Sequence, residues 1–353
     1  MVLTAPTALW VVPVSDLGGV ARHVLDVART GIPGWRLVFL TPPGPLPERL
    51  RDLGAQVHEQ SFGPDHSLRS SVTALRDVVR RLRPDVVHTH LSYADIVAAL
   101  AVGRGPRLVT TEHGIARDDV VYHRSPGKAR AMAAVHTARL RRFDAAIAVS
   151  EATAAAMVDK WHPRHDVVVV PNGVDAVPPP GPPTIGLRIL SLARLSPEKR
   201  LSALVDGFAH LVREHPEATL TIAGTGPEEP ALRNQVDGLG LSGSISLPGF
   251  VDPAVALAQH DVLAMLSVWE NCSYALLDAA AEGLGVVASN VGGNCELLPK
   301  TSLIDATDAM TVASALSKQG LDPTARPGLT SWPTVAQMCA ITAEVYATTG
   351  GRP

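Results

Sequence analysis

The sequence contains few cysteines, few aromatic residues and no long apolar segment. Its three cysteines, Cys272, Cys295 and Cys339, lack CxxC spacing, which argues against a disulfide framework and a structural zinc site and favours reduced thiols. Aromatic residues make up only 4% of the chain, and no basic stripe with interleaved aromatics occurs, so nucleic acid is not a predicted partner. No apolar run reaches the roughly 18 to 20 residues that cross a bilayer, and the N-terminus lacks a secretory signal pattern. These absences predict a soluble cytoplasmic protein.

The apolar residues that are present suffice for two hydrophobic cores. With 353 residues, 46% of them hydrophobic, the chain is long enough for two domains of about 150 to 200 residues each. Apolar segments of strand length recur, and each is followed by a Gly, Pro or polar turn and then by a helical pattern. Because these segments are continuously apolar, they are typical of parallel strands covered on both faces. The predicted fold class is α/β, with doubly wound parallel sheets.

A proline-rich stretch divides the chain. Residues 176–186 contain five prolines and no strand or helix pattern, which is typical of a linker. We therefore predict a Rossmann-like N-terminal domain over 1–175, a linker over 176–185 and a Rossmann-like C-terminal domain over 186–328. The remaining segment, 329–353, has the pattern of a terminal helix.

Charge is distributed unevenly between the two halves. Residues 1–175 carry 21 Lys and Arg against 17 Asp and Glu, whereas the rest of the chain carries 10 against 17. Much of the positive charge lies in two stretches with helical patterns, 69–83 and 128–142. A solvated helix face is the simpler interpretation. The alternative is attraction to an anionic acceptor or to an acidic membrane surface, which would place the protein at the inner face of the membrane.

The segment 269–283, WENCSYALLDAAAEG, has the layout of a binding site. Glu270 lies between a predicted buried strand and a predicted helix that starts near Ser273, and Asp278 lies about two turns into that helix. The first amides of a helix favour an anion, and here they belong to Asn271, Cys272, Ser273 and Tyr274. Two carboxylates beside such amides suit a ligand with hydroxyl groups and a phosphate. The simpler alternative is a helix that carries an N-terminal acid for dipole reasons.

Two cations follow another predicted strand. Arg194 and Lys199 stand five positions apart in LARLSPEKR, just after the apolar run ILSLA. Both side chains can therefore leave the same strand end and converge on one phosphate group. Two fixed cations would take the place of a metal.

The order of the motifs resembles the retaining, metal-independent glycosyltransferases of family 4 (glycosyl transferases group 1), which have the GT-B fold. The motifs are LGGV at 17–20, DVVHTH at 85–90, TEHG at 111–114, AVSEAT at 148–153, PNGVD at 171–175, LARLSPEKR at 192–200, LTIAGTGPEEP at 220–230, LPGF at 247–250, the segment 269–283 and SNVGGNCELL at 289–298. The resemblance implies two Rossmann-like domains facing an interdomain cleft. The first would bind the acceptor and the second the nucleotide sugar, with the terminal helix, anchored by Trp332, crossing back onto the first.

The resemblance also assigns roles to the charged residues. It implies that Arg194 and Lys199 hold the donor diphosphate and neutralise charge on the leaving nucleotide. Glu270 would bind hydroxyls of the donor sugar, with the amides of 271–274 near the sugar and the distal phosphate. Asp278 would bind the ribose hydroxyls. The family usually has Glu at this last position, so the shorter Asp278 is a departure from the pattern. The sequence contains no DxD motif, so no metal ligand is predicted.

Two glycine pairs belong to the same resemblance. Gly18 and Gly19 open a predicted helix, where they would let the backbone approach a phosphate or the acceptor. Gly224 and Gly226 would lie beside the nucleotide. A tight turn is the simpler interpretation of either pair.

Three histidines end predicted strands of the N-terminal half. His88 and His90 stand in DVVHTH, and a structural role is the usual explanation for such residues. For His113 the resemblance implies a place near the donor sugar, bonding its C6 hydroxyl or orienting the acceptor. Asn172 would lie at the mouth of the hinge or form a structural turn.

The resemblance implies a retaining transfer of a hexosyl group from a nucleotide-diphosphate sugar to a hydroxyl acceptor, with no cofactor beyond the donor. UDP-sugars are preferred over GDP-sugars. The acceptor would be a glycan, a lipid-linked precursor or a specialised metabolite, bound by the loops at 42–47, 63–67 and 115–126. Because no carboxylate is placed for a nucleophile, we predict front-face attack with the donor phosphate taking the acceptor proton. A catalytically silent GT-B partner protein and a GT-B sugar-nucleotide epimerase are the alternatives.

Overall fold

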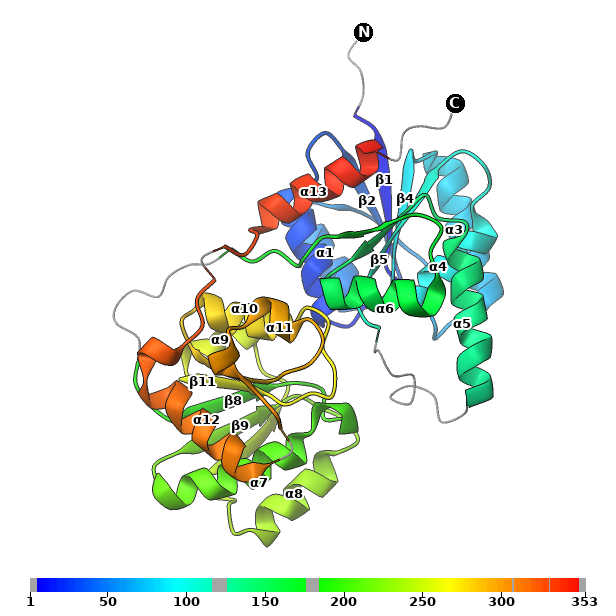
Figure 1. Cartoon of the computed structure of the whole chain (residues 1–353). Coiled ribbons are helices and arrows are strands. Elements are labelled where there is room, and N and C mark those ends of the chain that lie inside the picture. The colour runs from blue at the N-terminus through cyan, green and yellow to red at the C-terminus, as the bar shows by residue number, and fades with distance from the viewer. Residues whose placement is uncertain (1–4, 116–125, 176–183, 307, 330, 349–353) are drawn as a thin grey trace. The chain divides into compact units, whose positions relative to one another are not determined.

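The computed structural model describes residues 5–115, 126–175, 184–306, 308–329 and 331–348 (Figure 1). The chain folds into two compact units, one formed by Met1–Gly173 with Pro333–Pro353 and the other by Val174–Trp332. Most of the predicted linker lies outside the described residues. The same is true of residues 116–125 in the predicted acceptor loop at 115–126. No helix in the described ranges is both long enough and apolar enough to traverse a membrane.

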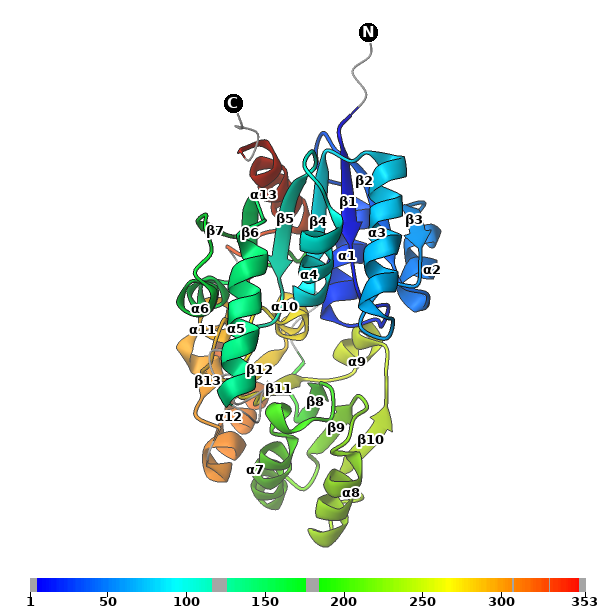
Figure 2. The same cartoon turned by 90° about the vertical axis from the view of Figure 1, so that its right-hand side faces the viewer.

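The first unit contains a parallel seven-stranded sheet in the order β3-β2-β1-β4-β5-β6-β7. Its strands are β1 (Thr7–Val11), β2 (Arg36–Thr41), β3 (Gln56–Glu59), β4 (Val86–His90), β5 (Arg107–Glu112), β6 (Ala145–Ala148) and β7 (Val167–Val169). Its helices are α1 (Gly19–Thr30), α2 (Pro45–Asp52), α3 (Leu68–Leu82), α4 (Leu91–Ala101), α5 (Pro126–Leu140), α6 (Glu151–Trp161) and α13 (Val335–Thr348). Figure 2 shows α3, α4 and α5 on the face of this sheet that is turned to the viewer.

Each face of this sheet has its own core, because successive side chains of a strand point to opposite sides. In β1, Trp10 packs with residues of α1 and α13, whereas its neighbours Leu9 and Val11 pack with residues of α3 and α4. All three side chains are fully buried. The continuously apolar strands therefore lie between two layers of helices.

The second unit repeats this topology with six strands in the order β10-β9-β8-β11-β12-β13. Its strands are β8 (Arg188–Leu192), β9 (Thr219–Ala223), β10 (Ile245–Gly249), β11 (Val262–Met265), β12 (Gly285–Ser289) and β13 (Leu303–Ile304). Its helices are α7 (Leu201–Glu214), α8 (Glu229–Gly238), α9 (Pro253–Ala258), α10 (Tyr274–Ala281), α11 (Asn294–Leu297) and α12 (Ala309–Leu321), with short 3-10 turns η2 (Pro197–Lys199), η3 (Lys300–Ser302) and η4 (Pro323–Ala325). The predicted α/β class with two doubly wound parallel sheets is confirmed.

Two strands were missed by the sequence pattern, and both lie at sheet edges. β3 is exposed or half-buried along its whole length and carries the polar sequence QVHE, while β13 has only two residues. An edge strand covered on fewer sides lacks the continuous apolar run that marks a central parallel strand.

The terminal helix α13 packs against the first unit, beside α1 (Figure 1). Its Tyr346 is fully buried, and the phenol oxygen accepts a hydrogen bond of 3.0 Å from Trp10 Nε1 and lies 2.6 Å from His88 Nδ1. Trp332, the predicted anchor, packs against the core of the second unit, which contains Leu276 and Leu277. The helix is held by Tyr346 and the apolar residues around it.

Candidate functional site

In the second unit, Lys199 and Glu270 form an ion pair. Lys199 ends η2, just after β8, and Glu270 follows β11, the neighbouring strand. The Lys199 ammonium donates to a carboxylate oxygen of Glu270, and the side chains are only 19% and 13% exposed. Because the carboxyl ends of neighbouring parallel strands lie at the same sheet edge, two residues 71 positions apart meet there.

Two glycines bring the loop after β8 against the loop after β9. A Cβ on Gly224 would lie 1.9 Å from the carbonyl oxygen of Ala193, and one on Gly226 would lie 2.3 Å from that of Leu195. The φ of Gly224 is also +141°, which disfavours other residues. Glycine is therefore required at both positions by close packing against the backbone on either side of Arg194.

Arg194, the other of the two predicted phosphate-binding cations, is exposed. Its side chain is 73% exposed, and its nearest acidic partner is Glu198, at 3.8 Å from Nη2. Partial burial raises the pKa of Glu198, but the hydrogen bond from Ser196 and the charges of Arg194 and Lys199 outweigh this effect and leave the pKa below its usual range. The weakly held guanidinium is therefore accessible to an anion.

The loop that carries Glu270 is positioned by a second glycine pair. Gly293 N–H donates to the carbonyl oxygen of Glu270 at 3.0 Å, and a Cβ on Gly292 would lie 2.0 Å from the same oxygen. Val268 N–H donates to the carbonyl of Glu198 at 2.8 Å, which ties this loop to the one carrying both cations. Sequence reasoning missed the positioning role of Gly292 and Gly293, although the adjacent glycines in SNVGGN were the available signal.

Helix α10 begins where the sequence predicted, directly after Ser273. Ser273 is the N-cap but its hydroxyl makes no capping hydrogen bond, so it does not occupy the first amides of the helix. Asn271 and Tyr274 are buried, whereas Cys272 and Ser273 are half-buried. The side chains around this turn thus leave part of it accessible, next to Glu270.

Asp278 lies on α10 and is half-buried. Burial and the charge of Asp278 both raise the pKa of Glu282, one turn further along. Asp278 therefore contributes a negative potential to this side of the helix. The roles predicted for Asp278 and for the amides of 271–274 remain predictions.

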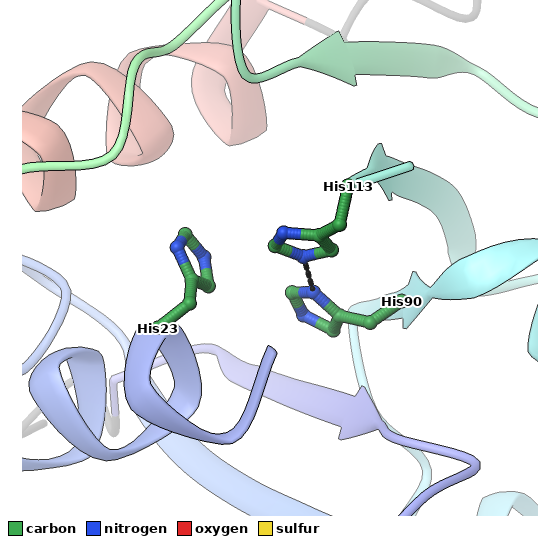
Figure 3. A group of neighbouring side chains, drawn as sticks. All are labelled: His23, His90 and His113. Atoms are coloured by element: carbon green, nitrogen blue, oxygen red, sulfur yellow. Dashed lines mark hydrogen bonds between the residues drawn. The ribbon is translucent and has the colours of Figure 1, made fainter. Parts of the chain in front are cut away.

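In the first unit, three histidines from distant segments lie together. His23 comes from α1, His90 ends β4, and His113 follows β5 (Figure 3). His90 Nδ1 lies 2.9 Å from His113 Nε2. His88 lies deeper, bonded to Tyr346 and to Thr111 at 2.8 Å, which supports its structural interpretation.

Burial keeps these imidazoles neutral. It lowers the pKa of His23 to about 4, although a hydrogen bond with Asn172 opposes the shift. Burial, together with repulsion between the rings, also holds the pKa values of His90 and His113 well below the usual range. None of these three side chains carries a charge near neutral pH.

A buried charged cluster lies beside His113. Arg139 pairs with Asp95 and, at 3.1 Å, with Glu112, and all three side chains are at most 3% exposed. Asp95 also accepts a hydrogen bond of 2.9 Å from Thr110. Burial raises the pKa of Glu112 to about 7, because hydrogen bonds from Gly114 N–H and the Ser92 hydroxyl offset only part of the desolvation. One guanidinium thus serves two carboxylates.

Gly18 and Gly19 are exposed, and no feature of the described residues of the first unit requires glycine at either position. Gly18 is the N-cap of α1 with an ordinary φ of −110°, and Gly19 is the first residue of the helix. A Cβ on either would meet no atom of a described residue within 4 Å. Neither strain nor packing requires glycine here, which agrees with a ligand that approaches the backbone.

We expect Gly19→Ala to separate stability from function. Alanine favours a helix over glycine by up to about 1 kcal/mol, so the thermal midpoint should stay unchanged or rise. A methyl group between the backbone and the ligand should lower kcat/KM about 10-fold or more, since small displacements of substrate are costly. Gly103→Ala, at another exposed and unstrained glycine of the same unit, is the matched control. Equal kcat/KM in both variants would contradict a ligand at Gly19.

Comparison with known families assigns both halves of the chain. The family model described as Glycosyltransferase Family 4 matches residues 17–177, and the one described as Glycosyl transferases group 1 matches residues 186–319. The chain belongs to glycosyltransferase family 4. The resemblance drawn from the ordered motifs is therefore confirmed, and the two parallel-sheet units are those of the GT-B fold.

Two curated relatives of this glycosyltransferase span most of its length. The glycogen synthase of Mycobacterium tuberculosis is 29% identical, with 96% of this chain and 92% of the relative covered. The 2-deoxystreptamine glucosyltransferase of Streptomyces kanamyceticus is 27% identical, with 86% of each chain covered. Among solved structures, Anabaena Alr3699/HepE in complex with UDP and glucose superposes with a TM-score of 0.77 at 21% identity, covering 98% of this chain and 97% of that one. That structure shares the fold.

Proposed function

We propose that this glycosyltransferase transfers a hexosyl group from a UDP-sugar to a hydroxyl acceptor with retention of anomeric configuration and without a metal ion. The observation that carries the proposal is the Lys199–Glu270 ion pair at one sheet edge, with Arg194 exposed on the same loop. These are the charges that a sugar diphosphate needs, since the cations match the phosphates and the carboxylate matches sugar hydroxyls. The UDP-glucose complex of the structurally similar HepE supports the choice of donor.

The ion pair suggests how the donor engages the site. Before the donor binds, Glu270 holds the Lys199 ammonium in place, so the cation is already largely desolvated and oriented. The diphosphate then competes with Glu270 for the ammonium, while Arg194 reaches it from the exposed side. Glu270 becomes available to accept hydrogen bonds from sugar hydroxyls. A preorganised cation costs little reorganisation when charge grows on the leaving diphosphate.

The transfer itself proceeds on one face of the sugar. The acceptor oxygen forms a bond to the anomeric carbon as the bond from that carbon to the diphosphate oxygen breaks. The departing diphosphate oxygen takes the acceptor proton, so no protein base or nucleophile is needed. Attack from the face that the leaving group vacates retains the configuration. Arg194 and Lys199 stabilise the negative charge that develops on the nucleotide.

The remaining donor contact is assigned to Asp278. Its carboxylate would bind the ribose hydroxyls from α10, about one helical turn after Tyr274. The side chain is one methylene shorter than the usual Glu, and a bridging water would make up the difference. His113, in the first unit, would bond the sugar or orient the acceptor through its neutral imidazole.

The first unit would bind the acceptor, whose class is a glycan, a lipid-linked precursor or a specialised metabolite. Four arginines of α3 are exposed, namely Arg69, Arg76, Arg80 and Arg81. They give this helix a positive face that suits an anionic acceptor or the acidic inner surface of the cytoplasmic membrane. The proposed location is the cytoplasm, with peripheral contact at that surface.

Calorimetry with UDP, GDP and ADP in excess chelator tests the donor site. We expect one equivalent of UDP to bind the wild type, and binding to be weakened at least about 10-fold in Arg194→Ala, since a charge-assisted contact contributes roughly 1.5 to 3 kcal/mol. Arg213→Ala, at an exposed arginine of the same unit, is the control. If no diphosphate binds without metal, the transferase proposal fails and the silent-partner alternative replaces it.

NMR of the product formed from an α-linked donor tests the anomeric configuration. A β-linked product contradicts retention.

A further inference from the structure

The three histidines of the first unit form a compact group of nitrogen atoms. His23, His90 and His113 each offer one ring nitrogen, and the three nitrogens lie within 4.8 Å of one another. The rings approach one another from separate elements, as Figure 3 shows, with centroids 4.8 Å apart for His23 and His113 and 5.2 Å apart for His90 and His113. Three imidazoles around one point are a ligand arrangement typical of zinc and its neighbours among the transition metals.

His90 carries a polar atom that the protein leaves without a partner. Its side chain is fully buried, and Nε2 has no hydrogen-bond partner in the part of the chain that the structure describes. The ring packs 4.4 Å from Trp10, whose indole cannot accept a conventional hydrogen bond. Leaving a buried ring nitrogen unpaired costs about 1 to 3 kcal/mol, so this atom is an observation that asks for a ligand. It is independent of the grouping of the three rings.

The surroundings of His23 resemble the support of a metal ligand. Its Nδ1 lies 3.2 Å from the side-chain oxygen of Asn172, which is itself 3% exposed. An oxygen acceptor fixes the proton on Nδ1 and turns the lone pair of Nε2 toward the other two rings. Metal-bound histidines commonly donate their second N–H to an oxygen in this way.

An aromatic side chain covers one side of the group. Trp10 packs against two of the rings and limits solvent access from that side.

We propose that His23, His90 and His113 bind one divalent transition-metal ion of the zinc class. Three nitrogen ligands leave a fourth position of a tetrahedral ion for water or a bound hydroxyl. Zn–N bonds of about 2.0 to 2.1 Å place ligand nitrogens roughly 3.4 Å apart. Binding through Nε2 of His90, the nitrogen without a partner, therefore turns the His90 ring and gives up the 2.9 Å contact of its Nδ1 with Nε2 of His113. Side-chain rotation suffices for this change. Mg²⁺ does not fit, because it prefers oxygen ligands.

This site is separate from the diphosphate chemistry and does not depend on the proposed transfer. The residues proposed to hold the donor diphosphate lie in the second unit, and none of them is a histidine. Binding of the metal engages His113, however, and takes that ring away from any sugar or acceptor. Metal occupancy is therefore expected to oppose the role assigned to His113, and the test uses binding as its readout.

The test titrates Zn²⁺ into untagged, chelator-treated full-length protein by calorimetry, and Co²⁺ by absorption spectroscopy. We expect one Zn²⁺ per chain and an intense visible Co²⁺ band of a four-coordinate site, both lost in His23→Ala, His90→Ala and His113→Ala. His165→Ala, at an exposed histidine of the same unit, should bind as the wild type does. Absence of binding to the wild type, or retention of binding in any of the three ligand variants, overturns the proposal.

A second measurement does not require that the variants fold. In wild-type protein with ¹⁵N-labelled histidine, one equivalent of Zn²⁺ should shift the ring nitrogens of three of the 13 histidines. Asn172→Ala should weaken Zn²⁺ affinity about 10- to 100-fold, as expected for loss of the acceptor behind a ligand. A shift confined to other histidines, or unchanged affinity in Asn172→Ala with His23 unshifted, would refute the assignment.

Discussion

Replacement of Lys199 by methionine is expected to lower kcat about 10³-fold. The ammonium is mostly buried against Glu270, so its field at a bound diphosphate is little screened by water. Removal of one such preorganised group typically costs 10²- to 10³-fold in rate, and the upper end applies because a full charge is lost. Methionine keeps an unbranched side chain only one atom shorter, so the main change is the loss of the charge. Steady-state release of nucleotide from the donor measures the effect.

Two further variants show whether the loss of kcat depends on the buried position of Lys199 or only on the removal of a positive charge. Arg194→Ala should reduce kcat less, by roughly 10²-fold, because a side chain that is 73% exposed is better screened. Lys318→Met removes an exposed lysine of the same unit and should leave the rate unchanged. If Lys318→Met lowered kcat as much as Lys199→Met, the effect would come from the change in net charge and not from the position of Lys199. A loss below about threefold in Lys199→Met would remove Lys199 from the leaving-group site.

The fold was predictable from the sequence because its central strands are buried on both faces. Such strands are mostly continuously apolar, as in Val262–Met265 of β11, and the pattern is local. The edge strands β3 and β13 had no such requirement and were missed. Fold class therefore followed from periodicity, whereas the number of strands depended on edges that carry little apolar signal.

The candidate site was predictable only where its residues share short segments. Arg194 and Lys199 stand in one motif and Glu270 in another, and each motif ends a strand of the same sheet, so the pairing of Lys199 with Glu270 follows from topology. The histidine group could not be found in this way. His23 lies 67 positions before His90 on a helix with no motif, and only the stacking of α1 on the sheet brings the two together.

The two predicted glycine pairs look alike in the sequence, but the structure gives them different explanations. Gly224 and Gly226 are required by backbone oxygens that lie under 2.5 Å from where a Cβ would stand. At Gly18 and Gly19 no atom of a described residue lies within 4 Å of where a Cβ would stand. The family resemblance implied ligand contact for all four glycines, with a tight turn as the alternative, and only the packing separates glycines that close a loop from glycines that leave room beside it.

Arg139→Met is expected to destabilise the first unit by about 3 to 5 kcal/mol at pH 8, which lowers the thermal midpoint by roughly 10 °C. The variant leaves Asp95 and Glu112 buried without their cation, and both side chains are at most 2% exposed. Methionine fills much of the space of the arginine, so the loss reports the charge. Calorimetric unfolding of the wild type and the variant measures it, with Arg142→Met, at an exposed arginine nearby, as control.

The dependence of this loss on pH identifies Glu112 as the group responsible. Burial raises its pKa from 4.5 to about 7, so the folded state keeps a proton that the unfolded state has already released. The resulting stability is fully present below pH 4.5 and is lost as the pH rises through 7, to a total of about 3 kcal/mol. Glu112→Gln should therefore flatten the stability of the wild type across this window. The deficit of Arg139→Met should shrink at pH 5, where Glu112 is neutral, and the double variant Arg139→Met/Glu112→Gln should recover part of it at pH 8. A deficit of equal size at both pH values would show that Glu112 is not the group responsible, and would assign the loss to the ion pair with Asp95 or to packing of Arg139 against Trp161, 4.8 Å away.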